Sequence, residues 1–127
     1  MAPAPVISRR SLAPRTFAHR PTQPFDSAEQ AWFWFWQCQI ARDDGARFVA
    51  DAGRVARPCD PDDLWRAALG LLRRRRIDRR HLRVLSLFGR RLTPPDPRLA
   101  EEAIAARLWD DAIDRLSTPL RAKGIVA

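Results

Sequence analysis

Few side chains in this sequence have the chemistry to bind a metal ion. Its only histidines and cysteines are His19, Cys38, Cys59 and His81, and no two of them have the short spacing of a zinc motif such as Cys-x-x-Cys. Because cysteine is among the most buried residue types, two inert thiols in the core account for Cys38 and Cys59. The sequence therefore predicts no metal site and no cofactor.

A catalytic site is not predicted either, because a nucleophile needs a base and an orienting group within hydrogen-bond reach. His81 is the only histidine beyond the N-terminal stretch, and it stands between arginines on a basic segment, a setting that argues against burial. The chain has no glycine-rich phosphate loop and no Gly-x-Ser-x-Gly motif. Helix capping and a solvated helix face account for the acids near positions 60 and 110. We therefore predict that the protein is not an enzyme.

One central segment is strongly basic, with nine arginines between positions 73 and 91 and a single acid, Asp78. Such a cluster of like charges destabilises a compact fold by self-repulsion, which a polyanion or an acidic partner would relieve. The alternative is an ordinary solvated face whose arginine content is raised by the codon bias of a GC-rich genome. Such a bias is indicated because Lys123 is the only lysine of the chain. We predict that nucleic acid is bound by Arg73, Arg74, Arg75, Arg76, Arg79, Arg80, Arg83, Arg90 and Arg91.

Five aromatic residues follow one another at positions 32–36. On a helix with 100° per residue, Trp32, Phe33 and Trp36 share a face, which is typical of a buried core. Trp34 points almost the opposite way, so it either lies inside a wrapped helix or faces a partner. Bases stack on aromatics that are interleaved with arginines, whereas glutamine, cysteine and acids surround this run. We therefore predict a core helix with Trp34 as the candidate partner-binding residue.

The positive charge is unevenly distributed along the chain. The net charge is +8 and the isoelectric point about 11.4, which attracts polyanions in general. Residues 1–25 carry four arginines and no acid, and residues 70–98 carry ten arginines against two aspartates. The remaining segments are slightly acidic, so the whole excess of positive charge lies in these two stretches.

The composition is that of a globular protein, with 46% hydrophobic and 30% charged residues. The longest apolar stretch, residues 31–36, is far too short for a membrane span. Two cysteines do not suggest a disulfide scaffold, and no secretory signal is apparent. A cytoplasmic location and no membrane partner are expected.

The first 24 residues have prolines at positions 3, 5, 14, 21 and 24, a density that prevents regular helix or strand. We predict a disordered basic arm over residues 1–24 and a helical domain over residues 25–127. An arginine-rich leader without acids also resembles an organellar transit peptide, but the scattered prolines spoil the amphipathic helix that such a peptide needs.

Start and stop signals predict four helices and an all-α fold, a small bundle. The first helix is capped by Asp26 or Ser27 and ends at positions 43–45. The second begins at Asp60 with proline at its first position and ends in the arginines at 73–76. Residues 45–59 form a long connection between them with a short extended piece.

The third helix is capped by Asp78 and ended by Gly89. The fourth is capped by Asp96, with proline as its first residue, and Pro119 kinks or ends it before Gly124 closes the domain. The third helix presents Arg76, Arg79, Arg80 and Arg83 on the side opposite its apolar residues.

Residues 62–124 resemble a helix-turn-helix in two phrases, "LRVLSLFGRR" at positions 82–91 and "LWDDAIDRL" at positions 108–116. The resemblance is to sigma-factor region 4 and to phage late-transcription regulators, and it implies DNA binding in transcription. Those families place a further short helix between the two phrases, where this chain has a proline-rich segment. Residues 25–127 also look like a small uncharacterised family of alphaproteobacterial proteins, which implies a bacterial origin.

Two functional hypotheses follow from these observations. In the first, the central arginines and the basic arm grip nucleic-acid phosphates, which predicts low sequence specificity and a strong salt dependence. In the second, the protein is an adaptor whose arginines meet an acidic protein partner and whose Trp34 supplies a hot spot. The shared sign of charge on the arm and the central segment favours nucleic acid.

Overall fold

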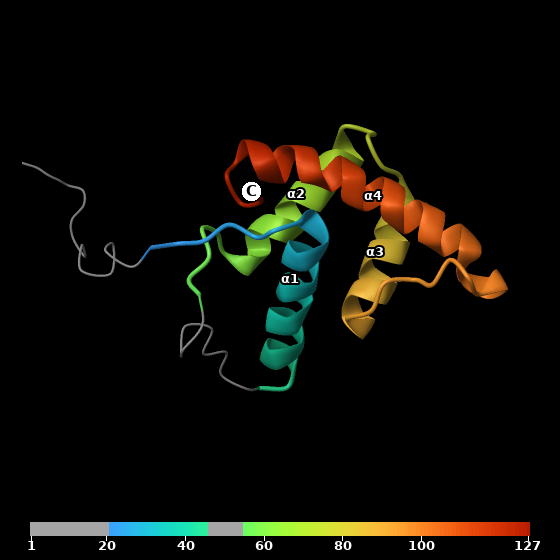
Figure 1. Ribbon diagram of the computed structural model, residues 1–127, viewed down its shortest axis with the longest axis horizontal. Helices are drawn as coiled ribbons and strands as arrows, with labels where there is room; N and C mark the ends of the chain where they lie inside the picture. The colour runs from blue at the N-terminus through green and yellow to red at the C-terminus, as the bar shows by residue number, and fades with distance from the viewer. Residues whose placement is uncertain (1–20, 46–54) are drawn as a thin grey trace, which may run out of the picture.

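The computed structural model describes residues 21–45 and 55–127, which form four α-helices (Figure 1). The described part of the chain has no regular strand and only two isolated β-bridges. The helices are α1 (Ala28–Asp43), α2 (Pro61–Arg73), α3 (Arg79–Arg91) and α4 (Ala103–Ala122), with a short 3-10 helix, η2 (Ala100–Glu102), before α4. The predicted all-α fold is therefore confirmed.

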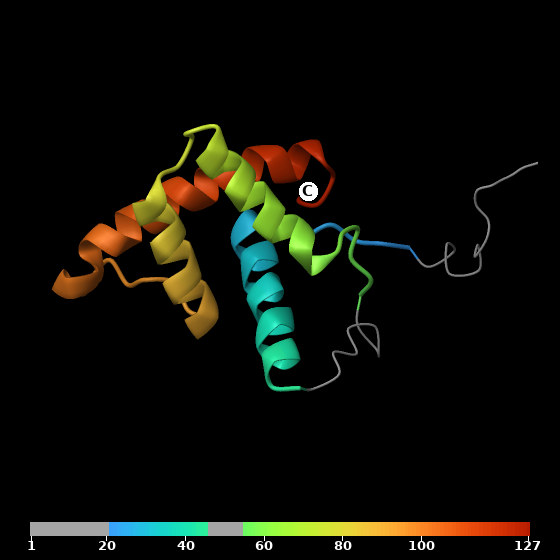
Figure 2. The same ribbon diagram turned by 180° about the vertical axis from the view of Figure 1, so that it is seen from behind.

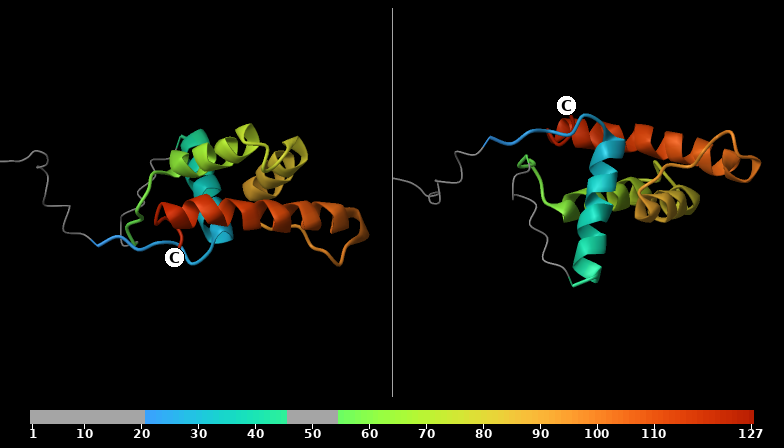
Figure 3. Two further views of the ribbon diagram at one scale, coloured as in Figure 1. Left: turned by 90° about the horizontal axis from the view of Figure 1, so that it is seen from above. Right: turned by 60° about the horizontal axis from the view of Figure 1, so that its bottom comes forward.

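Helix α4 lies across one end of the bundle (Figures 1 and 2). Helices α1 and α3 both begin beside α4 and run away from it in the same direction, and α2 crosses α1 on the opposite side from the viewer of Figure 1. Helix α2 contacts α4 and crosses it, so that its C-terminal end lies beyond α4 (Figures 2 and 3). The α2–α3 turn therefore stands at the same end of the bundle as α4.

The core is built around α1, whose buried residues occur on more than one side of the helix. Trp32 is fully buried and donates its indole N–H to the carbonyl of Leu85 on α3, at 2.8 Å. Trp109 on α4 donates to the carboxylate of Glu29 at 2.7 Å. Because both indoles find acceptors, these two residues bury a large apolar area without an unpaired donor. The prediction that Trp32 and Trp36 lie in the core is confirmed, whereas Phe33 is half-buried and packs against it.

The predicted start of α1 is confirmed, with Ser27 as its cap. The Ser27 hydroxyl accepts the N–H of Gln30, and the Gln30 side chain accepts the N–H of Asp26 at 2.7 Å. These bonds satisfy donors that the first turn leaves free. The cap of α2 is also as predicted, since the carboxylate of Asp63 accepts the N–H of Asp60 at 2.9 Å.

Gly89 does not end α3, as the sequence predicted, and the helix continues to Arg91. Leu92 takes the left-handed conformation instead, with φ of 57°, and donates its N–H to the carbonyl of Gly89. Gly89 itself is buried, and a Cβ there would lie 2.4 Å from the ring of Trp36 and 2.8 Å from that of Trp32. Its role is close packing rather than helix termination.

The start and end of α4 differ from the sequence prediction. Asp96 caps a turn, because its side chain accepts the N–H of Arg98 at 2.9 Å, and α4 begins only at Ala103. At the other end the helix passes through Pro119 to Ala122. A proline so close to the C-terminus costs one hydrogen bond, while its neighbour Leu120 is fully buried and ties the last turn to the core. Gly124 follows with φ of 75°, as predicted for the close of the domain.

The described chain begins to pair with the domain before the predicted boundary at Phe25. Gln23 donates its N–H to the carbonyl of Ala56 at 2.9 Å, which accounts for the extended piece expected in the connection. Arg57 donates to the carbonyls of Gln23 and Pro24. Residues 1–20 of the predicted arm and residues 46–54 of the connection lie outside the described residues.

In the part of the chain that the structure describes, no helix is both long and apolar enough to cross a bilayer.

Candidate nucleic-acid interface

The α2–α3 turn determines how the first arginines of the basic segment are displayed. The N–H of Arg76 bonds to the carbonyl of Leu71 at 2.9 Å, and that of Arg75 to the carbonyl of Leu72 at 3.0 Å. This pair of bonds is the Schellman motif, and it requires a left-handed residue, here Arg75 with φ of 60°. Ile77 then turns into the core. Four exposed arginines at positions 73–76 thus surround a tight turn that a buried residue holds in place.

A row of arginines runs along the exposed face of α3. At 100° per residue, Arg79, Arg83 and Arg90 lie within about 40° of one another, and Arg80 and Arg91 both lie to one side of them. The opposite face is buried through His81, Val84, Leu85, Phe88 and Gly89. The row extends over the length of α3, about 18 Å at 1.5 Å per residue.

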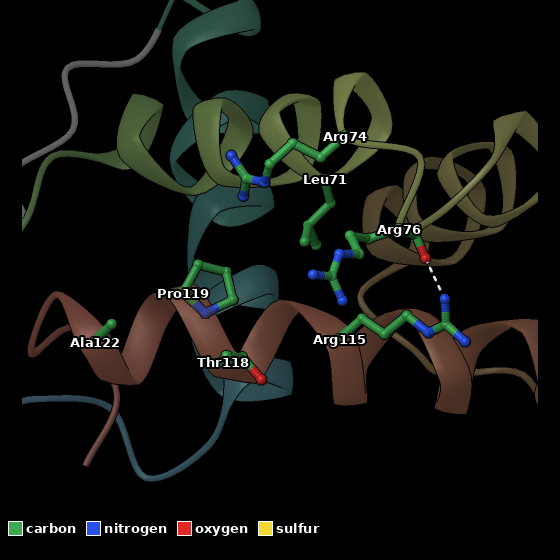
Figure 4. A pocket seen from close by; sticks show the side chains of 7 residues that line it. All are labelled: Leu71, Arg74, Arg76, Arg115, Thr118, Pro119 and Ala122. Atoms are coloured by element: carbon green, nitrogen blue, oxygen red, sulfur yellow. Dashed lines mark hydrogen bonds between the residues drawn. The ribbon is translucent and has the colours of Figure 1, made fainter.

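Arg76 is not part of this row, because α3 begins only at Arg79. The sequence had placed Arg76 on the same helical side, but it belongs to the turn and its side chain lies between α2 and α4 (Figure 4).

The nine predicted arginines differ in how far their charges are already engaged. Arg80 forms an ion pair with Asp78 at 3.1 Å. The hydrogen bonds from the Arg80 side chain, with those from the first backbone N–H groups of α3, lower the pKa of the Asp78 carboxyl to about 2. Arg90 and Arg91 lie over the rings of Trp36 and Phe88, with centroid distances of 5.2 and 5.3 Å. No ion pair within the described residues engages Arg73, Arg74, Arg75, Arg76, Arg79 or Arg83.

His81 is buried, contrary to the expectation from its arginine neighbours. Its Nε2 lies 2.7 Å from the carboxylate of Asp111 on α4, and its Nδ1 lies 3.1 Å from the backbone N of Asp78. Both ring nitrogens are therefore engaged, and the imidazole joins α3 to α4. The helical spacing of His81 with the buried residues at 85 and 88 is the signal that could have predicted this position.

Arg115 on α4 is a basic residue of this region that the sequence analysis missed. Its Nε donates to Asp111 at 3.1 Å, and its Nη1 donates to the carbonyl of Arg76 across the gap between the helices (Figure 4). Nothing in the sequence pattern links positions 76 and 115, because only the packing of α4 against the α2–α3 turn brings them together. The carboxylate of Asp111 thus contacts both His81 and Arg115.

The other residues considered in the sequence analysis, Trp34, Cys38 and Cys59, are not among the arginines of α3 and the α2–α3 turn. Trp34 is half-buried and packs on Phe25, with ring centroids 5.2 Å apart. Cys38 is buried, and burial raises the pKa of the half-buried Cys59 thiol to about 11, with the carboxylates of Asp63 and Asp60 adding to the shift. Among the described residues no group of three or more histidine, cysteine or acidic side chains could hold a metal ion.

Comparisons of this chain with protein-family models, with curated proteins and with solved structures found no match.

Proposed function

We propose that this chain binds nucleic acid through the phosphate backbone, with the arginines of the α2–α3 turn and of the exposed face of α3. The observation that supports this most directly is the row of Arg79, Arg83 and Arg90 on α3, continuous with the exposed arginines at 73–76. Ordinary protein surfaces mix both signs of charge, and here the only acid of the segment, Asp78, is already paired with Arg80. Guanidinium groups suit phosphate because they donate in a planar fork.

Phosphate contacts carry no sequence information, so the proposed binding has low sequence specificity. The role is one of binding and not of catalysis. The resemblance of residues 62–124 to helix-turn-helix regulators supports transcription as its setting. Helix α4, the counterpart of the second phrase, exposes Asp110 and Asp114, which repel phosphate. We therefore assign the contact to α3 and the α2–α3 turn, and not to α4.

The test is the salt dependence of binding to a short generic duplex, measured by fluorescence anisotropy. For phosphate contacts, log affinity falls linearly with log salt with a slope of about −0.9 per neutralised phosphate. A triple substitution of Arg73, Arg79 and Arg83 by Gln should reduce that slope by about 3.

A matched control replaces three exposed basic residues of the C-terminal part, Arg98, Arg107 and Arg121, by Gln. It removes the same charge from another surface and should change the slope far less. No binding by the unmodified protein at low salt, or an equal loss in both triple variants, would contradict the proposal.

A second candidate is an adaptor that meets an acidic protein surface with the same arginines. The observation that favours it is Leu87, which is 46% exposed on the same face of α3. An apolar side chain at the centre of a charged face is typical of a protein interface. Leu87→Ser should leave phosphate binding unchanged, whereas it should weaken an interface with an acidic protein.

A further inference from the structure

A hollow of about 510 Å³ lies between α2 and α4, beside the α2–α3 turn (Figure 4). Three arginines line it, Arg74, Arg76 and Arg115, together with Thr118. The guanidinium groups of Arg74 and Arg76 lie on its side, whereas that of Arg115 points away from it, toward the carbonyl of Arg76 (Figure 4). Its remaining lining is apolar and consists of Leu71, Pro119 and Ala122. No carboxylate is among the lining residues, so the hollow is a basic site with an apolar floor.

The backbone at the edge of this hollow is held in place before any ligand arrives, because Arg115 bonds to the carbonyl of Arg76. Arg115 is fixed through its bonds to Asp111 and to the carbonyl of Arg76. Arg74 folds back over its own helix at Gly70, where an added Cβ would lie 3.4 Å from its Nη1. The side chain of Arg76 points into the space between the helices, between the other two (Figure 4). Groups that are already ordered cost less entropy on binding.

The charge and shape of the site select a class of ligand. The two unpaired cations of Arg74 and Arg76 match a dianion better than a singly charged phosphodiester, and a terminal phosphate monoester carries about −1.5 to −2 at neutral pH. Its three oxygens accept hydrogen bonds from several guanidinium groups, which are the strong, charge-assisted kind. The apolar floor offers a surface to an attached sugar and base, and the volume is within the range of small-molecule sites, about 300–1,000 Å³.

We infer that this hollow binds the terminal phosphate monoester of a nucleotide, either at the end of a nucleic-acid strand or as a free nucleotide. The inference rests on the proposed function, because the hollow opens beside the arginines assigned to phosphate contacts and shares Arg74 and Arg76 with them. The hollow would recognise the end of a strand, beside a surface that otherwise contacts the phosphate backbone.

The test compares two single strands of one sequence, one with a 5′-phosphate and one with a 5′-hydroxyl, together with adenosine monophosphate as the free nucleotide. The full chain should bind the phosphorylated strand about tenfold more tightly, the gain expected from one additional hydrogen bond to a charged group. Adenosine monophosphate should compete for that difference.

Ala122→Glu places a carboxylate in the hollow at an exposed position of α4, and it should abolish the preference for the phosphorylated strand. Ala100→Glu is the matched control, because it adds the same charge at an exposed position outside the hollow. Thermal melting of both variants establishes that they fold.

Equal binding of the two strands by the unmodified protein, without binding of adenosine monophosphate, overturns this inference and leaves the proposed function standing. If neither strand binds and the generic duplex does not bind either, the proposed function fails. In that case, binding of adenosine monophosphate that is lost in Ala122→Glu and kept in Ala100→Glu would still support the phosphate site in the hollow. If adenosine monophosphate does not bind either, the inference is overturned as well.

Discussion

The indole of Trp36 on α1 lies directly against the backbone of Gly89 on α3, with no side chain of α3 between them. A Cβ at position 89 would lie 2.4 Å from both Cδ1 and Nε1 of Trp36. The indole N–H of Trp36 is buried and has no hydrogen-bond partner among the described residues. The close contact with Gly89 is thus favoured by packing alone, and it leaves a donor unsatisfied.

Gly89→Ala should therefore destabilise the protein although alanine is the better helix former. The clash is with two rigid rings and costs about 1–3 kcal/mol, against a gain of about 1 kcal/mol in helix propensity. Gly70→Ala is the matched control, because its Cβ would meet only the flexible side chain of Arg74 at 3.4 Å. It should stabilise α2 by up to about 1 kcal/mol. Urea denaturation of both variants measures the difference, and equal effects would show that Gly89 is not needed for packing.

Trp32 and Trp34 lie on the same helix but should differ strongly in their contribution to stability. Trp32 is fully buried and bonded to the carbonyl of Leu85, so Trp32→Ala should cost about 3–5 kcal/mol of unfolding free energy. Trp34 is half-buried against Phe25, and Trp34→Ala should cost about 1–2 kcal/mol. Thermal and urea melts of the two variants test this order. A loss at Trp34 as large as at Trp32 would leave no surface there for a partner.

The starts of α1, α2 and α3 could be predicted because their signals are local. Ser27, Asp60 and Asp78 cap their helices through bonds to residues two or three positions ahead, and short sequence motifs encode such bonds. The apolar spacing likewise identified the core face of α3.

The failures at Gly89, His81 and Arg115 concern features that depend on packing between helices. Gly89 was interpreted as a helix end, but its role is set by Trp36 and Trp32 on another helix. The arginine neighbours of His81 argue against its burial, but His81 has the helical spacing of the buried residues of α3. Its Nε2 lies within hydrogen-bond distance of Asp111 on α4. The contact between Arg115 and the carbonyl of Arg76 spans 39 positions of sequence, and no local pattern indicates it.

The carboxyl of Asp78 should titrate with a pKa well below the ordinary value of an aspartate. Its pKa is lowered from 3.8 to about 2, first by the hydrogen bonds from the Arg80 side chain. Because this pKa is lower in the folded state than in the unfolded state, the ionised carboxylate stabilises the folded protein at pH values above 3.8. That stabilisation is lost as the pH falls from 3.8 to about 2. A carboxyl-carbon NMR titration measures the midpoint.

Arg80→Gln removes the first cause of this shift and should raise the pKa of Asp78 toward its ordinary value. Arg79→Gln is the control, because it removes the same charge one position away without breaking a bond to Asp78. A midpoint that moves equally in both variants would attribute the shift to the general positive field and not to the ion pair.

Arg75 occupies a backbone position that favours glycine, and we expect Arg75→Gly to stabilise the protein. The same Schellman geometry recurs at Leu92 and at Gly124, with φ values of 57° and 75° against 60° at Arg75. A side chain in the left-handed region costs about 1 kcal/mol, so Arg75→Gly should raise the unfolding free energy by about 0.5–1 kcal/mol. Gly124→Ala, where glycine already occupies the position, should lower it by a similar amount.

Arg75→Ala separates backbone strain from charge, since it removes the guanidinium but keeps a Cβ at the strained position. If strain dominates, glycine should be more stable than alanine by about 1 kcal/mol in urea denaturation. Equal stabilities of the two variants would mean that relief of charge repulsion among the exposed arginines, and not the conformation, sets the effect. Both variants should bind duplex with a salt slope smaller by about 1. A more stable protein that binds less would identify Arg75 as a position where stability is given up for phosphate contact.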